Sequence, residues 1–298
     1  MYRHSMSVPI RYRYATVEGL KVFYRVAGPA SAPVILALHG VPSSSRMYDP
    51  LMRKLAPRYR LIAPDYIGFG NSDTPPPNKF TYTFDNLAAF TLKFADILGL
   101  RRFTLLMQDY GGPVGMRMAT ARPEAVRAMI FQNANVYDEG LGLVRETRRP
   151  FWSDRSAHEA TVRQGALEPA TVRNRHLGSD PNTEAYDPDL WMDELAYLHR
   201  PGIDAIQAEL IYDYQNNLAS YPTWQAWLRE HKPPSLILWG RCDQSFIPPG
   251  ADAFKRDLPD AKVVLLEGGH FVMDTCLDEV AEETEAFMQS LPEALGYE

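Results

Sequence analysis

Asp109 is an acidic residue in a position where it could act as a nucleophile. It follows the apolar run Phe103–Met107 and precedes Tyr110 and the glycine pair Gly111-Gly112, after which helix-forming residues begin. Small residues after a strand allow a sharp turn that holds one side chain up at the edge of a sheet. A carboxylate held there can attack saturated carbon and form an alkyl ester, which opens C–O or C–halogen bonds. An aspartate at such a junction can also serve only as a helix N-cap.

Asp243 and His270 are positioned in the sequence to complete a catalytic set with Asp109. Asp243 follows the apolar run Ser235–Trp239, and His270 follows the run Val263–Leu266. In a parallel sheet, functional side chains gather at the carboxyl ends of the strands. Along the chain, the three residues therefore occur in the order nucleophile, acid, histidine. This order is typical of a nucleophile that lies at a strand–turn–helix junction. We expect Asp243 to orient His270, and His270 to act as the base.

The elements that must position these residues are short apolar runs that alternate with helix-like segments. The strand-like runs lie at 34–38, 59–63, 103–107, 128–131, 235–239 and 263–266, and an antiparallel hairpin is predicted over 12–18 and 20–26. Continuous apolar strands indicate a mostly parallel sheet that is covered on both faces. The alternation stops between 137 and 227, where charged residues, aromatic residues and prolines accompany helical pieces such as 189–198 and 204–214. We predict a core from 1–136 and 228–298, with a helical cap inserted at 137–227.

Composition excludes several classes of protein. The chain has 298 residues, 45% of them hydrophobic, and a net charge of -6, which disfavours a nucleic-acid surface. The basic pairs Arg101-Arg102 and Arg148-Arg149 are interpreted as solvated surface. The two cysteines, Cys242 and Cys276, give no disulfide framework. Because no signal-like segment or bilayer-length apolar run occurs, we expect a cytoplasmic protein without a membrane partner, as a monomer or a homodimer.

Five short motifs together resemble those of the α/β-hydrolases that use an aspartate nucleophile, a branch that contains epoxide hydrolases and haloalkane dehalogenases. They are His-Gly-x-Pro at 39–42, Asp-x-x-Gly-x-Gly-x-Ser at 65–72, the elbow at Asp109, Gly-x-x-Asp at 240–243 and Gly-His at 269–270. The resemblance covers nearly the whole chain. It implies an α/β-hydrolase fold, with a mostly parallel central sheet, helices on both faces and an inserted helical cap. The His and Cys residues show no metal-ligand spacing, and no cofactor is implied.

The resemblance also implies a mechanism in two steps, with a small apolar molecule and water as substrates. Asp109 attacks carbon to form the ester, and His270 then activates water that hydrolyses it. The backbone N–H groups of Val41 and Tyr110 would stabilise the oxyanion. His39 is assigned to the same loop, as a structural and substrate-binding residue. In some relatives the acid follows an earlier strand, so Asp138 and Glu139 are alternatives to Asp243, which we prefer.

The leaving group is less well determined by the sequence. Tyr214 lies in a segment that resembles the cap helix motif of epoxide hydrolases, whose tyrosine protonates the opening ring; no second cap tyrosine can be placed. Trp152 instead suggests the halide-binding indole of dehalogenases. Tyr110 stands where dehalogenases and epoxide hydrolases alike usually have Trp, and Val41 stands where one dehalogenase subgroup has Asn. We therefore expect an epoxide hydrolase, with a haloalkane dehalogenase as the alternative and a ligand-binding protein that has lost catalysis as a third possibility.

Overall fold

One twisted sheet forms the centre of the protein. The computed structural model describes residues 8–292, and within them eight strands pair in the order β1-β2-β4-β3-β5-β6-β7-β8. The two pairs that involve β2 are antiparallel, and all the others are parallel. The strands are β1 Arg11–Val17, β2 Leu20–Ala27, β3 Val34–Leu38, β4 Arg60–Pro64, β5 Phe103–Gln108, β6 Val126–Gln132, β7 Ser235–Gly240 and β8 Lys262–Leu266.

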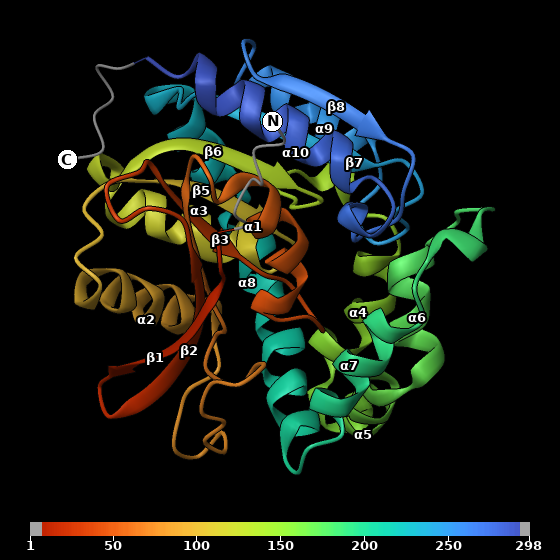
Figure 1. Cartoon of the computed structure of the whole chain (residues 1–298). Helices are drawn as coiled ribbons and strands as arrows, with labels where there is room; N and C mark the ends of the chain where they lie inside the picture. Colours follow the sequence, from red (N-terminus) through yellow and green to blue (C-terminus); the bar gives the residue numbers. More distant parts are fainter. Residues whose placement is uncertain (1–7, 293–298) are drawn as a thin grey trace.

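Helices cover both faces of this sheet, as Figure 1 shows. Helix α2 (Phe84–Ile97) and helix α3 (Gly111–Ala121) pack in one apolar cluster, whereas α1 (Asp49–Leu55) and α10 (Leu277–Ser290) pack in another. The short helix α9 (Pro249–Ala253) follows β7. The prediction of an α/β-hydrolase fold with a mostly parallel sheet is confirmed.

The continuous apolar strands belong to a sheet that is buried on both sides. Every residue of β3, β5 and β7 is buried. Successive side chains of a strand point to opposite faces, so Leu36 and Leu38 enter the cluster of α2 and α3, whereas Ile35 and Ala37 enter that of α1 and α10. With both faces apolar, polar chemistry is left to the ends of the strands.

Five helices lie between β6 and β7 and form what we call the helical segment, residues 143–231. They are α4 Leu143–Ser153, α5 Arg155–Leu167, α6 Pro169–Leu177, α7 Asp189–Leu198 and α8 Ile203–His231. In Figure 1, α4 to α7 gather to one side of the sheet and α8 runs back to the core. Helix α8 is longer than predicted because it continues through Pro222, and it contains the predicted boundary at residue 227. Within residues 8–292, no helix is long and apolar enough to span a bilayer.

Candidate active site

The turn at Asp109 holds its carboxylate at the carboxyl end of β5. Asp109 has a φ of 48°, in the left-handed region that non-glycine residues rarely adopt. A Cβ on Gly111 would lie 2.1 Å from the Leu38 carbonyl oxygen, so only glycine permits this close approach. The N-cap of α3 is Tyr110, whose side chain forms no capping hydrogen bond. Asp109 therefore does not act as a side-chain cap, and its strained conformation serves another purpose.

Three buried side chains meet at this edge of the sheet. The Nδ1 atom of His270 lies 2.7 Å from Oδ2 of Asp243, and its Nε2 atom lies 3.4 Å from Oδ2 of Asp109. The Nε2 atom has no hydrogen-bond partner among the described residues. All three residues are at most 4% exposed. The structure thus brings together the three residues that were expected from the sequence to be nucleophile, acid and base.

Three donors besides His270 hold the Asp243 carboxylate in place. Its Oδ1 atom accepts hydrogen bonds from the backbone N–H groups of Ser245 and Phe246, at 2.7 and 3.0 Å. Its Oδ2 atom also accepts a hydrogen bond of 2.8 Å from the side-chain amide of Asn133, at the end of β6. The sequence analysis missed Asn133, although its place directly after an apolar strand was a usable signal.

The two alternative acids, Asp138 and Glu139, are exposed and paired with other residues. Asp138 forms an ion pair with Arg145, and Glu139 forms one with Arg256. Neither carboxylate contacts His270 in the described structure. The geometry therefore favours Asp243 as the acid.

The charges of this set depend on one another. Burial by itself lowers the pKa of His270, but the negative charges of Asp243 and Asp109 raise it to about 9. Burial raises the pKa of Asp109, but His270 and Arg175 outweigh burial and hold that pKa below its usual value. At neutral pH, Asp109 is therefore ionised and His270 is an imidazolium between two carboxylates.

The loop after β3 supplies a backbone donor to Asp109. The Val41 N–H group donates a hydrogen bond of 2.8 Å to Oδ1 of Asp109. Gly40 makes this approach possible, because a Cβ there would lie 2.3 Å from the Cβ of Asp109. Asp109 thus presents Oδ1 to the Val41 N–H group and Oδ2 to His270 and the cavity.

His39 supports the loop and does not line the cavity described below. Its Nδ1 atom lies 2.9 Å from the carbonyl oxygen of Gly40, and its Nε2 atom accepts a hydrogen bond of 3.2 Å from the Tyr66 N–H group. Burial lowers the pKa of His39, which keeps the ring neutral. The structure therefore supports the expected structural role of His39. It does not support the expected role in substrate binding, because His39 is not among the residues that line the cavity.

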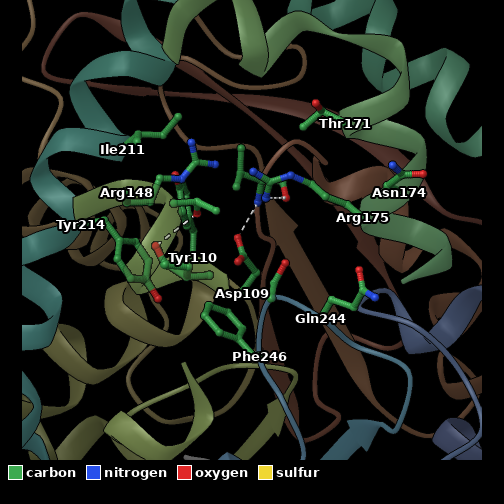
Figure 2. Close-up of a pocket in the computed structure, with 14 residues that line it drawn as sticks. Asp109, Tyr110, Arg148, Thr171, Asn174, Arg175, Ile211, Tyr214, Gln244 and Phe246 are labelled. Carbon is green, nitrogen blue, oxygen red and sulfur yellow. Dashed lines mark hydrogen bonds between the residues drawn. The ribbon is translucent and has the colours of Figure 1, made fainter. Parts of the chain in front are cut away.

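A cavity of about 280 Å³ opens above Asp109, between the sheet and the helical segment. Figure 2 shows the Asp109 carboxylate pointing into it, with side chains from the helical segment on the opposite side. Its lining residues are Val41, Asp109, Tyr110, Val144, Thr147, Arg148, Thr171, Asn174, Arg175, Ile211, Tyr214, Gln244, Ser245 and Phe246. This volume suits a small organic molecule.

Tyr214 is the cavity residue contributed by the centre of α8. Its ring is 4% exposed and lies 6.0 Å, centroid to centroid, from that of Tyr110. Burial raises the pKa of the Tyr214 hydroxyl well above its usual value, so the phenol stays protonated. Asp213 anchors this part of α8, because its Oδ2 atom accepts a hydrogen bond of 2.7 Å from the Phe84 N–H group at the start of α2. Tyr221 lies behind Tyr214 and interacts with it without lining the cavity.

The expectation that Trp152 binds substrate or halide is not supported by its position. Its indole N–H group donates a hydrogen bond of 2.8 Å to the carbonyl oxygen of Ile211, and Trp152 is not among the lining residues. The indole joins α4 to α8 and has no free donor for an anion. We therefore leave Trp152 out of the proposed site.

Two arginines of the cavity were missed. Arg148 from α4 and Arg175 from α6 both line it, whereas Arg149 is exposed to solvent. The interpretation of the pair Arg148-Arg149 as solvated surface is therefore wrong for Arg148. The two residues are neighbours on a helix, so their side chains point about 100° apart and only one can face the core.

Comparisons with known proteins agree with this fold. Residues 33–275 match the family model described as alpha/beta hydrolase fold. An uncharacterized hydrolase of Saccharomyces cerevisiae is 38% identical over 89% of this chain and 92% of its own length. Haloalkane dehalogenase 2 of Mycobacterium tuberculosis is 28% identical over 84% of this chain and 86% of its own length.

Solved structures of two enzyme types share the fold. A loop variant of the haloalkane dehalogenase DbeA from Bradyrhizobium elkanii has a TM-score of 0.76 at 22% identity, over 96% of this chain and 98% of that one. The epoxide hydrolase CorEH has a TM-score of 0.77 at 17% identity, over 95% and 100%. The chain therefore belongs to the α/β-hydrolase fold family.

Proposed function

We propose that this protein is a hydrolase that works through an alkyl ester on Asp109 and opens epoxides to diols. The observation that carries the proposal is the division of the Asp109 carboxylate between two partners. Oδ1 accepts a hydrogen bond of 2.8 Å from Val41 N–H, whereas Oδ2 faces the cavity 3.4 Å from His270. Oδ2 is free to attack carbon. Oδ1 already accepts a hydrogen bond from the kind of backbone donor that an oxyanion on this atom would need.

In the first step, Oδ2 of Asp109 forms a bond to an epoxide carbon and the C–O bond of the ring breaks. The ring oxygen leaves as an alkoxide and takes the proton of Tyr214, whose raised pKa keeps it protonated until then. Because Tyr110 has the same kind of buried phenol and also lines the cavity, it is a second possible donor. The product of this step is a hydroxyalkyl ester of Asp109.

Ester formation then changes the charge beside His270. The ester is neutral, so one of the two charges that raise the pKa of His270 disappears. The imidazolium can now release its proton, which restores the phenol of Tyr214. His270 becomes a neutral base only after the ester has formed.

In the second step, His270 accepts a proton from a water that attacks the Asp109 carbonyl carbon. The charge that develops on Oδ1 is stabilised by Val41 N–H, with the N–H group of Tyr110 as the expected second donor. Collapse of this intermediate breaks the bond from the carbonyl carbon to the alkyl oxygen, which takes the proton of the hydroxyl that came from water. The diol leaves, and the carboxylate is regenerated beside a protonated His270. One water is consumed and the starting charges are restored.

A haloalkane dehalogenase is the second candidate, favoured by the relatives of that name. The indole N–H group of Trp152, which was the expected halide donor, is already bonded to Ile211. The phenol of Tyr214 fits ring opening better, because an alkoxide needs a proton and a halide does not.

A panel of terminal epoxides and matching bromoalkanes tests the leaving group, with diol and halide followed together. We expect the wild-type protein to turn over epoxides, and Tyr214→Phe to lower kcat on them by about 10²- to 10⁴-fold, the usual contribution of a general acid. The same variant should affect halide release much less. Equal losses on both substrates would remove Tyr214 as the acid. Turnover that survives Asp109→Asn would remove Asp109 as the nucleophile, and binding of these ligands without turnover of any of them by the wild-type protein would indicate that the fold only binds ligands.

A further inference from the structure

Two positive charges face the nucleophile across the cavity. Figure 2 shows the side chains of Arg148 and Arg175 reaching into it from two different helices, above Asp109. Asp109 is the only acidic residue in the described lining, so the lining carries two positive charges and one negative charge, a net charge of +1. Such a cavity attracts an anion more strongly than a neutral molecule.

Neither arginine has the partner that a cation at a half-buried position normally finds. Arg175 donates a hydrogen bond of 3.4 Å from Nη1 to the carbonyl oxygen of Val41, which carries no negative charge. Across residues 8–292, neither guanidinium forms an ion pair with a carboxylate, although arginines elsewhere in the helical segment do, such as Arg155 with Glu209. Burial and the positive charge of Arg175 both lower the pKa of Arg148, which shows that the two cations repel one another.

An uncharged substrate would leave the positive charges of the two arginines without a negative partner. It would displace water from two guanidinium groups and offer them nothing in return, which is costly for charged groups. A carboxylate would accept hydrogen bonds from both arginines, and guanidinium and carboxylate match in geometry. A single negative charge also balances the net charge of the lining, whereas a phosphate dianion would exceed it.

Resting on the proposed function, we infer that the substrate is a small epoxy acid, whose carboxylate is held by Arg148 and Arg175 while Asp109 attacks the ring beside it. The expectation of an apolar substrate is replaced by that of a monoanion. The chemistry on Asp109 is unchanged: one ring C–O bond breaks, water is consumed, and the product is a dihydroxy acid.

Turnover of glycidate and its neutral isostere glycidamide tests this inference. We expect kcat/KM of the wild-type protein to be about 10- to 100-fold higher on glycidate, the effect of one or two hydrogen bonds to a charged group. Arg148→Met and Arg175→Met should each bring the ratio of the two values toward 1. Arg149→Met, at the exposed neighbouring position, is the matched control and should leave the ratio as in the wild type.

Binding of unreactive isosteres separates this inference from the proposed function. Cyclopropanecarboxylate and cyclopropanecarboxamide have the shape of the two substrates without the reactive oxygen, and calorimetry gives their affinities. We expect the carboxylate to bind at least about 10-fold more tightly, and Arg148→Met to abolish this difference. If the carboxylate binds selectively but no epoxide turns over, the proposed reaction is wrong and the anion site stands. If glycidamide is turned over at least as well as glycidate, or the carboxylate binds no better than the amide, the inference is wrong.

Discussion

Replacing Asp109 by asparagine should change the titration of His270. The substitution removes a negative charge whose Oδ2 atom lies 3.4 Å from Nε2 of His270. For unit charges at that distance, Coulomb's law gives about 1 kcal/mol at the dielectric constant of water and about 5 kcal/mol at an effective value of about 20. These energies correspond to about 1 to 3.5 pKa units. From a starting value of about 9, we expect the pKa of His270 to fall to between about 5.5 and 8 in Asp109→Asn.

NMR titration of the imidazole signals measures this pKa directly. His176 is an internal reference in the same spectrum, because the charges that raise its pKa belong to Glu194 and Asp274 and not to Asp109. Intact mass must show that the new asparagine has not hydrolysed back to aspartate. A His270 pKa that moves by less than about 0.5 units while His176 stays constant would refute the reasoning that ester formation frees the base.

Two further predictions concern groups around this set. The carboxylates of Glu194 and Asp274 raise the pKa of His176 to about 10. Its contribution to stability is therefore complete below pH 6.5, its unperturbed value, and is lost as pH rises toward 10. His176→Gln should therefore lower the free energy of unfolding in urea by about 3 kcal/mol at pH 7 and by much less at pH 10, and a loss independent of pH would contradict this. Gly40→Ala would place a Cβ 2.3 Å from the Cβ of Asp109. We therefore expect kcat to fall at least about 10-fold, while the circular dichroism spectrum stays unchanged. Normal activity would show that the loop can move aside.

The fold could be predicted from the sequence because the pattern of apolar residues along each run indicates its place in the sheet. Runs such as Val34–Leu38 are short and apolar at every position, as in a strand that is buried on both faces. The order of Asp109, Asp243 and His270 also needed no contacts to be recognised, because parallel strands bring their carboxyl ends to one edge.

The lining of the cavity could not be predicted in the same way. Which of Arg148 and Arg149 faces Asp109 depends on how α4 is rotated against the sheet, and α4 mixes charged and apolar residues. Trp152 was assigned a binding role from its residue type, but its indole N–H group is used by the Ile211 carbonyl, more than fifty residues away. Helix α8 continues through Pro222 because packing on the core outweighs the local cost of proline.

The central claim, that water attacks the enzyme and not the substrate, is tested most directly by a single turnover in heavy-oxygen water. Enzyme in excess over glycidate is allowed to react once, and the peptide that contains Asp109 is examined by mass spectrometry. The proposed mechanism predicts that one heavy oxygen enters the Asp109 carboxylate and that the first diol carries an unlabelled oxygen from the enzyme. Heavy oxygen found in the first diol, with none in Asp109 after repeated turnovers, would contradict it.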